Sequence, residues 1–342
     1  MTQYPMYSLK PERTNSFEIG FNARFLKYFE LDATYYNAKT ENQTFNPQLP
    51  INKYSKMYIQ TGSVRNQGIE LALNFENTWR NFTWMSGLTY SMNKNKIESL
   101  ADNVINSITG ELFSIPSLDM GGYADLRFIL REGGSMGDLY SRTDLRRDAN
   151  GAIYMDESNN VYTQKIDNPD SYIKLGSVLP KGNLAWRNNF MWKNFHVGFM
   201  ISARLGGVVF SRTQAVLDKF GVSEASADAR DNGFVLINGN DRINPENWYT
   251  TVGSTAVPQY YTYSATNVRL QEASIGYTIP RKWLANICDI KVSLIGRNLW
   301  MIYNKAPFDP EAVASTDNFY QGIDNFMMPS LRNVGFSLNF KF

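Results

Sequence analysis

The stretch Asn333-Val334-Gly335-Phe336-Ser337-Leu338-Asn339-Phe340-Lys341-Phe342 decides the fold class of this 342-residue chain. Every second residue in it is apolar, and each residue between them is polar or a glycine. The apolar set consists of Val334, Phe336, Leu338, Phe340 and Phe342. Because the side chains of a β-strand point alternately to opposite faces, this pattern predicts a strand with one apolar and one polar face.

The same alternation recurs in eight further segments. They lie at 16–25, 29–35, 69–75, 82–90, 184–192, 195–204, 273–279 and 290–295. Together with the first stretch, they predict an all-β protein with about nine strands. The polar positions are mainly Asn, Ser, Gly and Thr with single charges, a composition that favours a wet interior over the Lys- and Glu-rich surface of a soluble sandwich.

The connections between these segments alternate between short and long. Short ones lie at 27–28, 77–81, 193–194 and 280–289, and long ones at roughly 38–64, 93–183, 205–267 and 300–332. Outer-membrane barrels have tight periplasmic turns and long extracellular loops, and about 10 residues of tilted strand cross the membrane. Aromatic girdles form at the membrane interfaces, and the matching residues near strand ends are Trp79, Trp84, Trp192 and Tyr277. We therefore predict a transmembrane antiparallel β-barrel.

Composition removes several other classes of protein. Aromatic residues make up 14% of the chain, charged residues 19%, and the net charge of +2 argues against a nucleic-acid binder. One cysteine, Cys288, excludes an internal disulfide framework, and one histidine, His196, excludes a multi-histidine metal site. No apolar run reaches the 18 or so residues of a membrane-spanning helix. A soluble β-rich protein, carbohydrate-binding or hydrolytic, stays open as an alternative to the barrel.

The odd number of predicted strands points to a larger protein. Single-chain bacterial barrels have even strand counts. Residues 1–5 also lack the basic and apolar stretches of a signal peptide, although an outer-membrane protein must be secreted. We therefore expect residues 1–342 to form the C-terminal part of a larger barrel, whose plug and earlier strands this sequence does not include. A mature native protein of only 39.1 kDa would contradict this expectation.

Five segments, in order along the chain, resemble motifs in the C-terminal barrel region of SusC/RagA-like TonB-linked outer-membrane transporters (TonB-dependent receptors). They are 9–20 (LKPERTNSFEIG), 62–71 (GSVRNQGIEL), 269–280 (RLQEASIGYTIP), 296–299 (GRNL) with 307–311 (PFDPE), and 329–336 (PSLRNVGF). Each motif is short, but the five together span nearly the whole chain and keep the order of the family. Their order and the loop lengths between them make the resemblance specific.

The resemblance implies a barrel of about 22 strands, of which the predicted ones are the last, and an N-terminal plug with a TonB-binding box. It implies TonB-coupled import of a glycan or peptide oligomer across the outer membrane of a Gram-negative bacterium, without covalent catalysis or a resident cofactor. It also implies a partner, a SusD-like surface lipoprotein that captures the substrate. The final strand, with Val334, Phe336, Leu338, Phe340 and Phe342, would serve barrel assembly.

Aromatic residues of the long loops are the candidates for substrate contact, because aromatic faces stack on sugar rings and grip peptides. The third long loop carries Trp248, Tyr249, Tyr260, Tyr261 and Tyr263, and the fourth carries Phe319, Tyr320 and Phe326. Internal packing of the loops is the alternative role for each of these rings. The loops exceed what is needed to join the strands, which favours a functional role.

Two loop motifs have both a chemical and a structural interpretation. Residues 133–137 (GGSMG) match the nucleophile elbow of α/β hydrolases, yet a Gly-rich turn in an external loop explains them better. Positions 3, 5, 6 and 12 of a calcium-binding loop are matched by Asp148, Asn150, Gly151 and Glu157. Position 1 is Arg146, which has the wrong charge, so an Asn-Gly turn is favoured and calcium stays a weak hypothesis.

A carboxylate pair, the histidine and the cysteine are the other candidates for chemistry. Asp309 and Glu311 could form a paired-carboxylate acid/base set, but the prolines around them indicate a rigid loop. His196 is expected to be a polar residue of the lumen, with ligand contact as the lesser alternative. Cys288 lies in a predicted periplasmic turn and is expected to be a small residue without a redox role.

A passive porin or an adhesin-type barrel, whose loops only bind, is a second functional hypothesis. A plug and a TonB box in upstream sequence would distinguish active import from this alternative. A chain that is soluble and monodisperse without detergent would contradict both membrane hypotheses.

Overall fold

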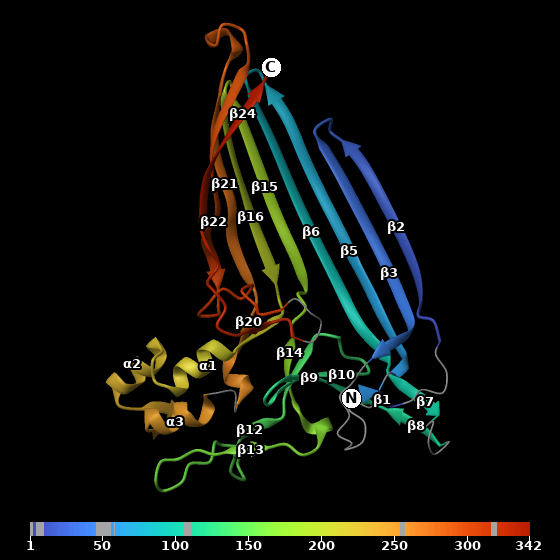
Figure 1. Ribbon diagram of the computed structural model, residues 1–342, viewed down its shortest axis with the longest axis vertical. Coiled ribbons are helices and arrows are strands. Elements are labelled where there is room, and N and C mark those ends of the chain that lie inside the picture. Colours follow the sequence, from blue (N-terminus) through green and yellow to red (C-terminus); the bar gives the residue numbers. More distant parts are fainter. Residues whose placement is uncertain are drawn as a thin grey trace.

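The computed structural model describes residues 3–4, 10–45, 56–57, 59–105, 111–253, 257–315 and 320–342. Its dominant element within these ranges is a nine-stranded antiparallel sheet (Figure 1). The strands are β2 (Arg13–Phe25), β3 (Phe29–Phe45), β5 (Ile59–Trp79), β6 (Phe82–Ser99), β15 (Gly182–Trp192), β16 (Phe195–Leu205), β21 (Asn267–Ile279), β22 (Asp289–Asn304) and β24 (Asn333–Lys341). Their order across the sheet is their order along the chain. Each predicted segment falls within one of these described strands, except that Phe342 follows the last residue of β24. The predicted up-and-down sheet is therefore confirmed.

Several strands are longer than the predicted length of about 10 residues. β3 has 17 residues, β5 has 21 and β6 has 18. At about 3.4 Å per residue, the longest extends for about 70 Å, whereas a hydrocarbon layer is about 30 Å thick. The extra residues lie at the long-loop end, where sequences such as 37–44 (NAKTENQT) are almost entirely polar. Neither face needs apolar side chains there, so the alternation disappears and the prediction ended these strands too early.

The short connections are tight turns at the opposite end of the sheet. Arg80–Asn81 and Lys193–Asn194 are the only residues between their paired strands. Arg80 and Lys193, the first residue of each turn, have left-handed φ angles of 52° and 51°, and a positive φ at this position is common to the favoured two-residue hairpin turns. The connection between β21 and β22 is longer, and it contains the 3₁₀ turn η3 (Arg281–Trp283) and the buried, free Cys288.

An aromatic band follows the apolar face of the sheet close to the short turns. Ring centroids are 5.4 Å apart for Phe25 and Phe29, which stack across the first hairpin. Farther along, Trp84 lies 6.0 Å from Phe190 on the neighbouring strand. The band continues through further pairs, Phe29–Phe75, Phe75–Trp84, Trp79–Phe82, Trp192–Phe195 and Phe195–Tyr277. The residues predicted to form a girdle therefore lie together at one edge of the apolar face.

The long loops fold into smaller elements at the other end of the sheet (Figure 1). The strands among them are β4 (Lys56–Met57), which pairs with β1 (Gln3–Tyr4) of the segment before β2, β7 (Ala101–Ile105), β8 (Leu112–Ile115), β9 (Ser117–Tyr123), β10 (Leu126–Arg131), β11 (Asp138–Ser141), β12 (Thr143–Leu145), β13 (Thr163–Lys165), β14 (Ile173–Ser177), β17 (Val208–Ser211), β18 (Val235–Ile237), β19 (Asp241–Ile243), β20 (Thr262–Ser264) and β23 (Ile323–Asp324). The helices are α1 (Arg212–Lys219), α2 (Glu224–Asn232) and α3 (Pro245–Val252), with 3₁₀ turns η1 (Pro169–Ser171) and η2 (Pro258–Tyr261). We call residues 100–178, 206–265 and 305–330, as far as they are described, the loop unit.

The α-helices of the third long loop were not predicted. Each begins at a side chain that caps it: Ser211, Ser223 and Asn244 each accept a hydrogen bond from a backbone N–H of the first turn. Such caps satisfy donors that have no partner within the helix. With only 8 or 9 residues apiece, these helices have little apolar periodicity to reveal them. Among the described residues, no helix has the length and apolar character needed to span a membrane.

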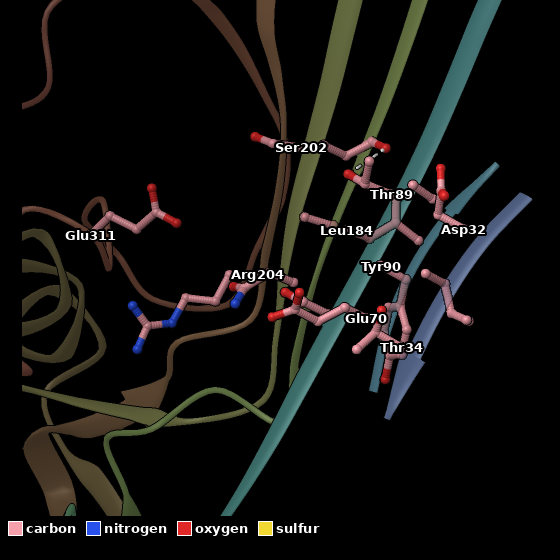
Figure 2. Close-up of a pocket in the computed structure, with 15 residues that line it drawn as sticks. Asp32, Thr34, Glu70, Thr89, Tyr90, Leu184, Ser202, Arg204 and Glu311 are labelled. Atoms are coloured by element: carbon pink, nitrogen blue, oxygen red, sulfur yellow. Dashed lines mark hydrogen bonds between the residues drawn. The ribbon is translucent and has the colours of Figure 1, made fainter. Parts of the chain in front are cut away.

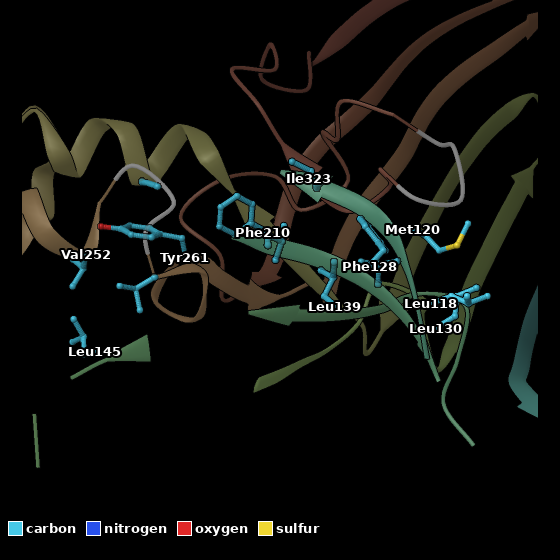
Figure 3. Close-up of a cluster of buried hydrophobic side chains, with 14 of the residues drawn as sticks. Leu118, Met120, Phe128, Leu130, Leu139, Leu145, Phe210, Val252, Tyr261 and Ile323 are labelled. Atoms are coloured by element: carbon cyan, nitrogen blue, oxygen red, sulfur yellow. The ribbon is translucent and has the colours of Figure 1, made fainter. Parts of the chain in front are cut away.

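A single hydrophobic core fills the loop unit (Figure 3). It combines Phe128 and Leu139 of the second long loop, Phe210 and Tyr261 of the third, and Ile323 of the fourth. The ends of β5 and β6 join it through Val64 and Ile97. Loops that are far apart in the sequence therefore form one packed body, held in place by the strand ends beneath it.

Candidate functional site

Two of the predicted contact residues are packed inside the loop unit. Trp248, on α3, is only 8% exposed, and its ring meets that of Tyr260 edge-on with centroids 5.3 Å apart. Tyr261, in η2, is 2% exposed and belongs to the core described above. Burial raises the pKa of Tyr261 far above its ordinary value, with a further contribution from nearby Asp218. These rings stabilise the loops from within.

Two further predicted residues are half-buried. The Tyr249 hydroxyl donates a 3.2 Å hydrogen bond to the carbonyl of Ala225, which joins α3 to α2. The Tyr263 ring contacts Phe308 of the fourth loop edge-on at 5.7 Å. Burial raises the pKa of Tyr249, and it raises the pKa of Tyr263 to about 12. Both phenols therefore stay neutral hydrogen-bond donors at any physiological pH.

The exposed members of the predicted set are Tyr260, Tyr320 and Phe326. Tyr320 is 43% exposed and Phe326 is 54% exposed. The backbone N–H of Phe326 donates a 2.7 Å hydrogen bond to the Thr213 hydroxyl at the start of α1. Phe319 lies outside the described residues. The structure thus separates accessible rings from packed ones, a division that the sequence pattern did not contain.

The third and fourth long loops are joined by backbone pairing. β17 and β23 pair in parallel, with Phe210 opposite Ile323. The Ser211 hydroxyl donates a 2.6 Å hydrogen bond to the buried Asp324 carboxylate. Arg212 donates to the side-chain oxygen of Asn325 at 2.7 Å. This pairing brings the two groups of candidate rings into one body.

A pocket of about 570 Å³ lies on the polar face of the sheet, close to the loop unit (Figure 2). Asp32 and Glu70 stand on one side of it, and Arg204 with Glu311 of the fourth loop stand on the other. Between them the wall carries mainly small and hydroxyl side chains, among them Thr34, Thr89, Ser91 and Ser202. Charges and hydroxyls on a concave wall suit a polar ligand. The side chains from the strands occupy polar positions of the alternating pattern, but Glu311 reaches the pocket from the fourth long loop, so the pattern did not predict the pocket.

Asp309 and Glu311 lie close together because both carboxylates form ion pairs with the same arginine, Arg269. The Arg269 guanidinium forms a two-pronged ion pair with Asp309, with N···O distances of 2.8 and 3.2 Å, and contacts Glu311 at 3.1 Å. Burial tends to raise the pKa of Asp309, but the Arg269 and Ser330 hydrogen bonds outweigh it and hold that pKa below its ordinary value. A carboxylate that stays ionised as an arginine partner is unsuited to donate protons as a general acid. The rigid-loop interpretation therefore fits this geometry.

The GGSMG segment forms a turn between β10 and β11 rather than a strand-to-helix elbow. The Ser135 hydroxyl donates to Asp138 at 2.7 Å and shares a 2.9 Å hydrogen bond with the Ser177 hydroxyl. His196 lies on β16, where its ring hydrogen-bonds the Thr278 hydroxyl at 2.9 Å. The geometry of a serine–histidine pair is therefore not met by these residues.

The segment that resembles a calcium loop forms two successive turns. The Asp148 carboxylate accepts the backbone N–H groups of Asn150 and Ala152 at 2.8 and 2.9 Å. Asp156 repeats the arrangement eight residues later with Ser158 and Asn160. Within the described ranges, no cluster of three or more His, Cys, Asp or Glu residues is placed to hold a metal ion. Both carboxylates are engaged by their own turns, as the turn interpretation requires.

The predicted assembly residues lie on one face of β24. Val334, Phe336 and Phe342 are among the most exposed large apolar side chains of the described chain. One edge of β24 pairs with β22, with Phe336 opposite Leu294, and its other edge has no strand partner within the described residues. An unpaired edge beside an apolar face is able to accept a further strand.

Comparison with known proteins gives matches along most of the chain. The family model described as TonB dependent receptor-like, beta-barrel matches residues 2–299. TonB-dependent receptor P3 of Formosa agariphila is 27% identical over 100% of this chain, and TonB-dependent receptor P26 of the same organism is 26% identical over 97% of it. The chain spans 35% and 34% of the lengths of these two relatives.

Solved structures with the same fold include those of RagAB. One, described as the RagAB peptide transporter, matches 97% of this chain with a TM-score of 0.72 and 16% identity. Another, the RagAB peptide importer in the closed-closed state, matches 97% of this chain with a TM-score of 0.70 and 17% identity. In each case the match covers 35% of the solved chain. At this identity the likeness establishes the fold of the strands and loops alone.

Proposed function

Because this chain belongs to the TonB dependent receptor-like, beta-barrel family, we propose that it forms part of an active nutrient importer in the outer membrane of a Gram-negative bacterium. The observation that carries the proposal is the family match over residues 2–299 together with an up-and-down sheet that has one apolar face. Members of this family are outer-membrane receptors whose transport depends on TonB. Import, rather than a covalent reaction, is the function we assign.

The apolar face of the sheet supports the membrane location. Phe17, Ile19 and Phe21 of β2 are all more than half exposed, as are Ile275 and Leu294 of β21 and β22. An exposed apolar surface of this extent is unfavourable in water but not in a hydrocarbon layer. The aromatic band near the short turns fits an interface between lipid and water. The loop unit then lies outside the cell.

We propose a nutrient oligomer, a glycan or a peptide, as the substrate. Support for a peptide comes from the RagAB structures, which are described as a peptide importer and transporter. The exposed rings of Tyr260, Tyr320 and Phe326 would contact the oligomer first, and the pocket on the polar face would contact it within the lumen. A SusD-like lipoprotein seated on the loop unit and TonB in the periplasm are the proposed partners.

We also propose that the described strands belong to a larger barrel. Both outer strands of the sheet, β2 and β24, have one edge without a strand partner among the described residues. The matched relatives are about three times as long as this chain. Val334, Phe336, Leu338, Phe340 and Phe342 would present the last strand to the assembly machinery and to lipid.

Uptake by cells that carry the native gene tests the proposal. Cells with and without the gene receive two fluorescent probe sets, labelled oligosaccharides and labelled tryptic peptides, with or without a protonophore. We expect deletion of the gene to abolish uptake of one set, and the protonophore to abolish it equally. Uptake that depends on the gene but resists the protonophore would indicate a passive porin. Normal uptake of both probe sets after deletion would contradict import.

A further inference from the structure

Three segments that resemble family motifs meet around one buried arginine. Arg269 comes from the first, Asn298 from the second, and Asp309 with Glu311 from the third. The Arg269 side chain is only 5% exposed and that of Asp309 only 9%. We call Asn267, Arg269, Asn298, Asp309, Glu311 and Ser330 the Arg269 cluster.

Every nitrogen of the Arg269 guanidinium has an acceptor. Its Nε donates to the Asn267 side-chain oxygen at 3.2 Å. Its two terminal nitrogens donate to both oxygens of Asp309 and to the side-chain oxygen of Asn298, and the nitrogen that faces Asp309 Oδ1 also contacts Glu311. A guanidinium paired in this two-pronged way is held in orientation as well as in position. The buried charge is therefore fully compensated.

A β-bulge turns Arg269 towards the polar face. Residue 269 has an odd number, as do Ala273, Ile275 and Tyr277, which lie on the apolar face. Unbroken alternation would therefore place Arg269 on the apolar face. In the pairing of β16 with β21, however, Gln271 is an extra residue, so that Arg269 stands opposite Ser202 of the polar face. One inserted residue moves the following side chains to the other side of a sheet. The bulge therefore serves to bring a charged side chain inside.

The cluster ties both ends of the fourth long loop to the sheet. Asp309 and Glu311 lie shortly after β22 ends, and Ser330, just before β24 begins, donates a hydrogen bond to Asp309. Asn298 also donates to the carbonyl of Leu331 at 3.2 Å. The same Glu311 forms one side of the pocket on the polar face. The position of this pocket side therefore depends on Arg269.

We propose that Arg269 is a positioning residue that fastens the 309–311 segment to the inner wall at the mouth of the barrel. This rests on the proposed import function, because the mouth is then the point where substrate leaves the loops and enters the lumen. Held in this way, Glu311 stands with Arg204 on one side of the pocket, opposite Asp32 and Glu70. Removing one partner of a buried ion pair leaves an uncompensated charge, so the segment would detach from the wall.

A labelling experiment on the full-length protein in whole cells tests this role. Ala306 is buried and lies three residues before Asp309, so Ala306→Cys, in a Cys288→Ser background, reports detachment of the segment. A membrane-impermeant maleimide should label this cysteine slowly when the cluster is intact. With Arg269→Gln or Asp309→Asn we expect labelling about tenfold faster, because local opening becomes more frequent. Arg269→Lys, which keeps the charge but not the fork, should give an intermediate rate.

The matched control is Arg297→Gln. Arg297 pairs with Glu272 at 3.0 Å on the same two strands, but this ion pair is exposed to solvent, so its loss should leave labelling unchanged. Heat-modifiable migration in gels confirms that each variant barrel is folded. Equal labelling rates in folded Arg269→Gln, Asp309→Asn and Arg297→Gln proteins would overturn the proposal. If Arg269→Gln does not assemble, Asp309→Asn and Arg269→Lys decide the outcome.

The two proposals fail separately in these measurements. Labelling reports the position of the segment without any substrate, so it decides the role of Arg269 even when no probe is taken up. Faster labelling together with protonophore-resistant uptake would retain the positioning role and reject active import. Unchanged labelling with protonophore-sensitive uptake would reject the positioning role and retain active import.

Discussion

The sheet and the loop unit place the same kinds of side chain in opposite environments. Phe21 of β2 is 57% exposed, whereas Phe128 of the second long loop is 0% exposed. The sheet contributes little to the hydrophobic core, which draws on β5 and β6 only at their loop ends. A hydrocarbon layer does not penalise an apolar face, but water does, so the loops must bury their apolar side chains against one another. The two regions are therefore stabilised in two different solvents.

The largest effect is expected from a substitution that destabilises the loop unit and leaves the sheet intact. Phe128→Ala removes a fully buried ring and should destabilise the loop core by about 3–5 kcal/mol. Limited proteolysis of the variant in detergent should cut the second and third loops early, while the strands keep their heat-modifiable migration. Phe21→Ala, on the apolar face of β2, is the matched control and should leave loop proteolysis unchanged. Equal protease resistance of Phe128→Ala and the parent would contradict a separate loop core.

A charge introduced on the apolar face should impair assembly of the sheet in the membrane without affecting the packing of the loops. Ile275→Arg places a guanidinium on the face assigned to lipid, at an expected cost of about 2–4 kcal/mol near the bilayer midplane. The variant should assemble poorly, as measured by the amount of folded barrel in outer-membrane fractions. Asn74→Arg, on the polar face of β5, is the control and should assemble like the parent. Similar assembly of both variants would contradict the lipid-facing assignment.

Substitution of a glycine on the polar face tests how tightly the strands pack there. A Cβ atom added to Gly68 would lie 2.1 Å from the Met92 carbonyl oxygen and 2.5 Å from the Tyr36 hydroxyl. Gly68→Ala should therefore destabilise the barrel by about 1–3 kcal/mol through overpacking. Urea unfolding followed by tryptophan fluorescence measures this change. Gly335→Ala, whose new Cβ would meet nothing within 4 Å, should leave the midpoint unchanged.

The smallest expected effect concerns pH and the Arg269 cluster. The folded-state pKa of Asp309 lies below its ordinary value, so the ionised carboxylate stabilises the folded loop. For a lowered pKa, this contribution is complete above the unfolded value of about 3.9 and is lost as the pH falls through the folded value. In the Ala306→Cys variant, the reactivity of the introduced thiol, corrected for its own ionisation, should stay constant from about pH 8 to pH 5. A rise in the corrected reactivity already near pH 6 would contradict the lowered pKa.

Alternation predicted the sheet well because lipid and lumen impose different side chains on successive residues. Where the strands extend beyond the membrane, as at 37–44, that demand ends and the prediction fails. Arg269 shows a second limit, since one extra residue in β21 reverses the face on which it lies. Bulges leave no signal in a period-two pattern until the neighbouring strand is known.

The loop unit was beyond prediction for a different reason. Trp248, Tyr260 and Phe326 are all aromatic loop residues, and nothing local distinguishes the packed ring of Trp248 from the exposed ring of Phe326. The capping residues Ser211, Ser223 and Asn244 were visible, but such short helices depend on tertiary packing more than on their own sequence. Burial in this region depends on contacts between residues far apart in the chain.

Local chemistry was enough to specify the all-β class, the up-and-down order of the strands, the apolar face and the tight turns at one end of the sheet. Each of these follows from neighbouring residues and from two solvents that meet at the sheet. Tertiary structure alone decided which loop rings are accessible, that Asp309 and Glu311 pair with Arg269, and that Glu311 forms a side of the pocket. These features require segments about 40 residues apart to meet, as Arg269 and Asp309 do. Chain entropy opposes such meetings, so the packed core of the loops and the compensated charge of the arginine must hold them in place.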